Sequence, residues 1–364
     1  MCRTPLHPFL AALPKCEHHL HLEGTLEPEL LFELARRNNI TLPASTDPAF
    51  GSAETLLARY KTFKNLDDFL GYYYIGMSVL LHASDFEALA YAYFSKAASQ
   101  SVRHAEVFFD PQAHTSRGVD LAAPVEGFKK AQARARADFG MSTGLIMCLL
   151  RHLPLSSAME TFSQARGAGY FADGTLAAVG MDSSELPFPP PMWKDLYDAA
   201  GAAGIRRTVH AGEEGPASYV TQALDLLGAQ RIDHGIGALL DGDDRLIARL
   251  VEQKTLLTMC PLSNVKLNVI PSIADFPLQK LLDSGVRFSI NSDDPAYFEG
   301  YILENYCALQ EAFRLSVRDW ESIAKGAVMG SWCSGSRKEE LLTEIGEVVR
   351  RWTGTYCEHH GDIN

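Results

Sequence analysis

Short runs of apolar and β-branched residues recur eight times along this chain, separated by longer stretches in which apolar residues have helical spacing. The runs are residues 16–21, 105–109, 143–149, 175–180, 206–210, 231–234, 255–259 and 286–291. Strands that alternate with helices form a parallel sheet with crossover helices, so this pattern constrains the fold more than any other feature. The sequence lacks the GxGxxG turn of a doubly wound sheet, and eight such units favour a closed (β/α)8 TIM barrel of the α/β class.

The interval between the first two runs is too long for one crossover helix. Helical spacing over residues 54–60, 66–81 and 85–101 predicts a helical insertion of about residues 40–104 after the first strand. The same spacing over residues 301–315, 320–329 and 338–352 predicts additional C-terminal helices. We therefore expect a single domain over residues 1–364. Its insertion follows a barrel strand, lies at the catalytic face, and could cover a site there.

Charge and cysteine usage exclude several classes of function. The 364 residues carry a net charge of -12, and such a surface repels nucleic acid. No stretch approaches the roughly 18 apolar residues of a membrane span, so we expect no membrane partner. The seven cysteines are scattered and never form a CxxC pair, which predicts reduced thiols. Together these features favour a cytoplasmic protein, or one that is also nuclear.

The most informative polar residues stand where the predicted strands end. His19 and His21 end the first run, His210 the fifth and His234 the sixth, and Asp293 follows the eighth. In a parallel barrel these strand ends open onto one face, so distant residues converge there. The two-residue strand period directs the side chains of His19 and His21 to the same side.

Imidazoles and a carboxylate at one barrel mouth suit a divalent metal such as zinc, with a coordination position left for water. A single buried histidine is more often a hydrogen-bonded core residue. The metal prediction therefore depends on several candidate ligands, including an HxH pair, occurring at separate strand ends.

Four segments resemble, in chain order, the sequence motifs of the adenosine and adenine deaminases within the metal-dependent amidohydrolases. They are residues 13–26 (LPKCEHHLHLEGTL), 210–213 (HAGE), 233–235 (DHG) and 292–295 (SDDP). The resemblance extends from residue 13 to about residue 301. It implies one zinc ion per chain, bound by His19, His21, His210 and Asp293, and a purine as the small-molecule substrate.

The resemblance also places Glu213, His234 and Asp294 in the site. A partly desolvated carboxyl group at Glu213 would have a raised pKa and could protonate N1 of the purine while C6 is attacked. His234 would orient the attacking water, take its proton, or stabilise the developing alkoxide. Asp294 would hydrogen-bond N7. Glu213 or Asp294 taken alone would more commonly be a solvated loop acid.

Two further residues bear on the choice of substrate. In the family a backbone contact to the N3 edge follows the fourth strand, where Gly180 stands, although a turn glycine without a ligand fits nearly as well. Adenosine deaminases carry aspartate in HxHxDG, whereas this chain has Glu23. The added methylene moves that carboxylate into space a ribose would occupy, from which it could accept a hydrogen bond from N9–H of a free base.

Residues 106–112 and 292–298 also resemble adenine deaminases more than adenosine deaminases. We therefore expect zinc-dependent hydrolysis of adenine to hypoxanthine and ammonia, a reaction of purine salvage. Two alternatives stay open. One is an enzyme that deaminates adenosine or 6-substituted purines, and the other is a barrel that binds a purine without turnover. The sequence leaves the oligomeric state undetermined.

Overall fold

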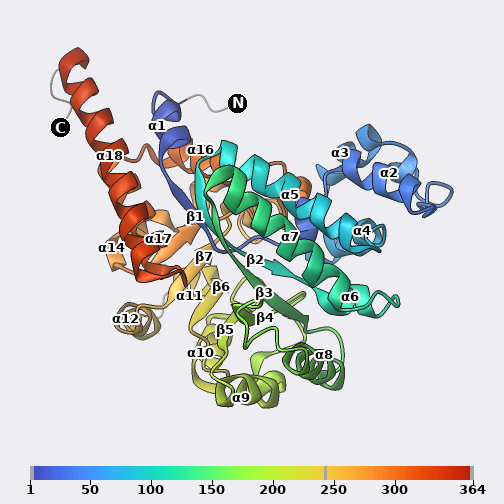
Figure 1. Ribbon diagram of the computed structural model, residues 1–364. Helices are drawn as coiled ribbons and strands as arrows, with labels where there is room; N and C mark the ends of the chain where they lie inside the picture. Colours follow the sequence, from blue (N-terminus) through green and yellow to red (C-terminus); the bar gives the residue numbers. More distant parts are fainter. Residues whose placement is uncertain (1–3, 242–243, 361–364) are drawn as a thin grey trace.

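Eight parallel strands form one sheet in the order β1 to β8 in this computed structural model, which describes residues 4–241 and 244–360, with side chains to residue 353 (Figure 1). The strands are β1 Lys15–Glu17, β2 Val102–Phe109, β3 Ser142–Leu150, β4 Ala178–Asp182, β5 Arg206–Ala211, β6 Arg231–His234, β7 Leu256–Met259 and β8 Phe288–Ile290. Just beyond β1 and β8, the N–H of His21 donates to the carbonyl of Asp293, and the N–H of Asp293 donates to that of His19, both at 3.1 Å. These bonds join the first strand segment to the last, and the predicted (β/α)8 barrel is confirmed.

Helices surround the sheet and connect its strands (Figure 1). From β2 to β8 they are α6 Pro111–Thr115, α7 Ala122–Phe139, α8 Leu155–Gly167, η3 Pro190–Trp193, α9 Lys194–Ala202, α10 Ala217–Leu226, α11 Ile236–Leu240, α12 Asp244–Gln253, α13 Pro261–Lys266, η4 Ile273–Asp275 and α14 Leu278–Ser284. After β8 come α15 Pro295–Phe298, α16 Ile302–Phe313, α17 Val317–Gly330 and α18 Gly335–His360, while α1 His7–Ala12 precedes β1. The described residues include no helix long and apolar enough to cross a membrane.

The segment between β1 and β2 is helical, as the spacing of apolar residues predicts. It contains η1 Glu23–Thr25, α2 Pro28–Arg37, η2 Pro48–Gly51, α3 Ala53–Tyr60, α4 Leu66–Met77 and α5 Ala83–Ser99. Helix α2 begins before residue 40 and was not predicted. Helix α5 packs along α7 in the outer layer, whereas α2 and α3 lie at the edge of the molecule (Figure 1).

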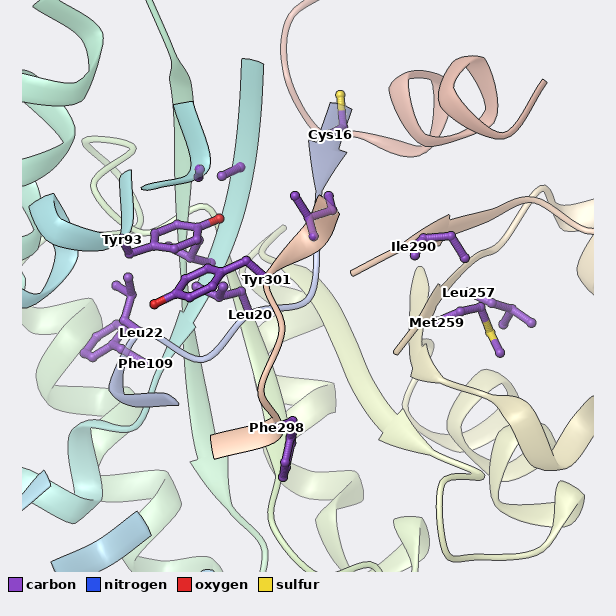
Figure 2. Packing of buried hydrophobic residues seen from close by; sticks show 14 of the residues in the cluster. Cys16, Leu20, Leu22, Tyr93, Phe109, Leu257, Met259, Ile290, Phe298 and Tyr301 are labelled. Atoms are coloured by element: carbon purple, nitrogen blue, oxygen red, sulfur yellow. The ribbon is translucent and has the colours of Figure 1, made fainter. Parts of the chain in front are cut away.

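The alternation of side chains after β1 explains how the chain directs its histidines inward. Leu20 and Leu22 are fully buried in the apolar layer outside the barrel, where Figure 2 shows them near Phe109, Tyr93 and Tyr301. Their sequence neighbours His19 and His21 therefore point to the opposite side, into the barrel mouth. Burial of the leucines fixes the direction of the histidines.

One sequence expectation about the thiols is wrong. Cys16, Cys148, Cys260 and Cys333 are free, but Cys307 is disulfide-bonded. The side chains of Cys2 and Cys357 lie outside the described part of the chain.

Candidate active site

A pocket opens at the C-terminal ends of the strands, where the sequence places its polar residues. Metal-ligand candidates and other acids line its floor, and helix α4 covers it with apolar and aromatic side chains. The lining residues are His21, Leu66, Phe69, Leu70, Tyr73, Tyr74, Asp110, Leu150, Asp182, Ser183, His210, Glu213, His234, Leu267, Asp293 and Asp294.

The four predicted metal ligands converge at the base of this pocket. Nε2 of His21 lies 3.3 Å from Nε2 of His210, and Oδ1 of Asp293 lies 3.2 Å from Nε2 of His19 and 3.5 Å from Nε2 of His21. Ligand atoms around a tetrahedral zinc ion with bonds of about 2.0–2.1 Å lie roughly 3.3 Å apart. The spacing of the donor atoms therefore fits a small divalent cation.

The protonation of the imidazoles supports the same conclusion. Nδ1 of His21 lies 3.4 Å from Oδ2 of Asp182, and Nδ1 of His210 lies 3.5 Å from Oδ2 of Asp233. We assign the ring proton to Nδ1 in each case because a carboxylate faces it. The two Nε2 atoms then face one another with lone pairs, an arrangement that needs a cation between them.

Asp233 sits behind two of the candidate ligands. Its carboxylate accepts hydrogen bonds from the hydroxyls of Thr208 and Thr258, at 2.6 and 3.0 Å. Since Thr258 uses its proton in this way, its oxygen accepts the bond of 2.9 Å from Nδ1 of His19, which leaves Nε2 of that ring free for a metal. One fully buried carboxylate thus orients His19 through a hydroxyl and faces His210 directly. Such partners fix the orientation of metal-binding histidines.

The backbones of Asp293 and His234 lie in the left-handed region, with φ of 64° and 60°, which residues other than glycine rarely adopt. Such strain is found at sites where the surrounding structure enforces it. Burial would raise the pKa of Asp293, but the nearby His19, His234 and His21 rings outweigh it and hold that pKa well below its usual value. Burial, with the His19 ring, lowers the pKa of His234 well below normal. Asp293 is therefore an anion and His234 a neutral imidazole.

Glu213 is held as a neutral acid beside this cluster. Burial raises its pKa well above the usual value, and the negative charges of Asp293, Glu185 and Glu214 add to the effect. Its Oε1 lies 3.5 Å from Nε2 of His234. A protonated carboxyl group facing the pocket can deliver a proton to a bound molecule.

Asp294 also lines the pocket as a buried acid. Burial raises its pKa well above normal, and the charges of Asp293 and Asp110 act in the same direction. The backbone of Gly24 packs directly against it, since a Cβ atom on Gly24 would lie 1.9 Å from Oδ1 of Asp294. The glycine is therefore needed for the aspartate to occupy this position.

Glu23 and Gly180, the remaining sequence candidates, do not line the pocket. Glu23 is completely buried, and its Oε1 accepts hydrogen bonds from the backbone N–H of Asp110 at 3.1 Å and from Nε2 of His114 at 2.8 Å. Gly180 lies in the middle of β4, where a Cβ atom would come within 2.6 Å of Sγ of Cys148. The pocket residue that follows this strand is Ser183, whose φ is 74°.

Sequence reasoning missed several residues of the pocket. Asp110 and Asp182 stand at the ends of β2 and β4, so strand-end position was a signal for both. The cover formed by Phe69 and Tyr73 of α4 gave no such signal, because aromatic residues at helical spacing are usual in a packed core. Their place over the site follows from the tertiary fold.

Known proteins similar in sequence to this chain match it over nearly its whole length. Residues 14–348 match the family described as adenosine deaminase. The chain is 56% identical to the adenine deaminase of Schizosaccharomyces pombe, over 97% of this chain and 95% of that protein. It is 52% identical to the adenine deaminase of Aspergillus fumigatus, over 97% of this chain and 99% of that one.

Two solved structures are similar to this chain over most of its length. The adenine deaminase from Arthrobacter aurescens is similar with a TM-score of 0.87 and 44% identity, over 93% of this chain and 100% of that chain. An amidohydrolase from Burkholderia ambifaria, with bound zinc, is similar with a TM-score of 0.85 and 26% identity, over 98% of each chain.

Proposed function

The chain belongs to the adenosine deaminase family, and on this premise we propose that it is an enzyme that hydrolyses adenine to hypoxanthine and ammonia. The observation that carries the proposal is the meeting of His19, His21, His210 and Asp293 beside the buried acid Glu213, whose pKa is raised by burial. The relatives named adenine deaminase, which match nearly the whole chain, support adenine as the substrate. We also propose that residues 1–364 act as one domain, with purine salvage as its role.

We propose that His19, His21, His210 and Asp293 bind one zinc ion per chain. The donor set of three imidazoles and one carboxylate suits zinc, and the spacing of the donor atoms fits it. When bound, zinc lowers the pKa of water and so supplies a nucleophile at neutral pH.

Glu213 acts as the proton donor in this proposal. Deamination requires a proton at N1 as C6 is attacked, and later a proton on the leaving ammonia. Glu213 is kept protonated by burial and faces the pocket, so it can supply the first proton. His234, a neutral imidazole 3.5 Å from Glu213, orients the attacking water or accepts its proton.

Substrate contacts complete the proposal. Asp294, protonated through burial, donates a hydrogen bond to N7. Glu23 stands at the end of the site where a nucleoside would carry its ribose. There it accepts a hydrogen bond from the backbone N–H of Asp110 and so fixes the position of Asp110. Gly180 acts indirectly in this proposal. It leaves room for the side chain of Cys148 and so positions β4, the strand that precedes Ser183. The cytoplasmic or nuclear location stays a prediction.

Ammonia release by the purified protein, supplied with adenine, adenosine and 6-substituted purines, tests this function. We expect the highest kcat/KM with adenine, loss of activity in His210→Ala, and loss of turnover without loss of metal in Glu213→Gln. A higher kcat/KM for adenosine than for adenine would make adenosine the substrate. Full activity in either variant would overturn the mechanism. Metal or purine binding without ammonia release would indicate a binding protein.

A further inference from the structure

Asp110 is an acid of the pocket that no step of the proposed reaction uses. It is 2% exposed, lines the pocket, and has a carboxylate oxygen within 4.8 Å of both a ring nitrogen of His21 and an oxygen of Asp182. Its Oδ2 accepts a hydrogen bond of 3.2 Å from the hydroxyl of Tyr73. Its Oδ1 is buried and makes no hydrogen bond of ordinary geometry within the described residues, where the neighbouring acid is Asp182, whose side chain interacts with the Asp110 carboxyl group. Leaving a buried polar atom unpaired is costly, so an absent partner is expected there.

The position of Asp110 is fixed from behind. Its backbone N–H donates to Glu23, whose carboxylate is also bound by the ring of His114. Asp110 precedes helix α6, yet its side chain makes no capping hydrogen bond to that helix. The carboxylate is therefore not occupied by local structure and is free to meet a ligand in the pocket.

The placement of the other pocket acids singles out Asp110 as an acceptor. Glu213 faces the ring of His234, and Asp182 faces the ring of His21. Asp294 packs against the backbone of Gly24. Asp110 already receives a hydrogen bond from Tyr73 and retains a second oxygen for another donor. A free purine base carries one N–H on its five-membered ring, at N9, where a nucleoside carries a sugar carbon.

We propose that Asp110 is a specificity-determining residue that accepts the hydrogen bond of N9–H and so selects the free base over N9-substituted purines. Glu23 then acts as the positioning residue that holds Asp110. This inference rests on the proposed deamination of adenine. It assigns the direct contact with N9–H to Asp110, because Glu23 is buried behind Asp110 and does not line the pocket.

The test compares adenine with 9-methyladenine, in which a methyl group replaces the N9 hydrogen. Deamination rates and inhibition constants of both compounds are measured for the wild type, Asp110→Ala and Tyr73→Phe. Both variants lose the Tyr73–Asp110 hydrogen bond, but only Asp110→Ala loses the acceptor. Pairing a donor with a buried acceptor that otherwise lacks a partner corresponds to roughly 10- to 100-fold in binding. We expect Asp110→Ala to lose about that factor in kcat/KM for adenine and less than about threefold in affinity for 9-methyladenine.

The outcomes separate this inference from the proposed function. If the wild type deaminates adenine and Asp110→Ala weakens both compounds equally, Asp110 is structural and the inference is wrong. If Tyr73→Phe loses the preference for adenine over 9-methyladenine while Asp110→Ala keeps it, the inference is also wrong. If the wild type releases no ammonia from adenine, the proposed function itself fails. Should Asp110→Ala not fold, Asp110→Ser, which also removes the carboxylate, is read by the same criterion.

Discussion

The carboxylate of Glu185 accepts a hydrogen bond of 3.0 Å from the backbone N–H of Glu213. It also accepts from Gly212 at 3.0 Å and Gly215 at 2.8 Å, so one buried acid holds the whole loop that carries the proposed proton donor. We expect Glu185→Ala to lower kcat for adenine by about 100-fold, because a displacement of roughly 1 Å in a catalytic group costs that much. Steady-state kinetics with a metal assay check this. An unchanged kcat, or a loss explained by missing metal, would contradict it.

A second prediction concerns the contact between Gly24 and Asp294. Gly24→Ala places a Cβ atom where Asp294 lies, so we expect that carboxyl group to be displaced and kcat/KM to fall at least about tenfold. Gly71→Ala in helix α4 is the control, because a Cβ atom there meets nothing within 4 Å. Equal activity of the two variants would show that the position of Asp294 is unimportant.

Asp233 is expected to control metal affinity without binding the metal. Asp233→Asn removes the charge that faces His210 and disturbs the Thr258 hydroxyl that accepts from His19. The affinity for zinc should fall about 10- to 100-fold, as for other partners of metal-binding histidines. Competition with a chelator measures it, and Asp173→Asn in an exposed turn is the control. If Asp233→Asn retains the wild-type affinity, the proposed role of Asp233 is wrong.

The raised pKa of Glu213 gives a pH dependence with a definite sign. Below its pKa the carboxyl group is protonated and can donate, and above that pKa it cannot. Because burial raises this pKa well above the usual value, kcat/KM for adenine should be retained at neutral pH and fall at alkaline pH. Glu213→Gln should bind metal normally and lose roughly 100- to 10,000-fold in turnover. A profile that rises through the alkaline range would contradict the assignment of Glu213 as the acid.

Much of the fold was predictable because barrel strands are short, apolar and regularly spaced. The run at residues 231–234 coincides with β6, and the first run, 16–21, extends past β1, which ends at Glu17. Helix α2 was missed, because a ten-residue helix within a long insertion has no strand beside it to mark its place. The disulfide at Cys307 could not be predicted from scattered cysteines, because pairing depends on distances in the folded chain.

The candidate site was predictable where strand ends supply its residues. His19, His21, His210 and Asp293 meet because each lies at or just beyond the C-terminal end of a barrel strand. The contacts of Glu23 were not predictable, since its side chain could have pointed into the pocket or behind Asp110. Only the packing of η1 against β2 and α6 decides between these positions.

Removal and return of the metal tests the central claim most directly. The purified protein is depleted with a chelator, its metal content is measured by mass spectrometry, and ammonia release from adenine is followed as zinc is added back. We predict no activity in the depleted protein and recovery that is complete at one zinc per chain, with no recovery in His210→Ala. Full adenine deamination by metal-free protein would contradict the account.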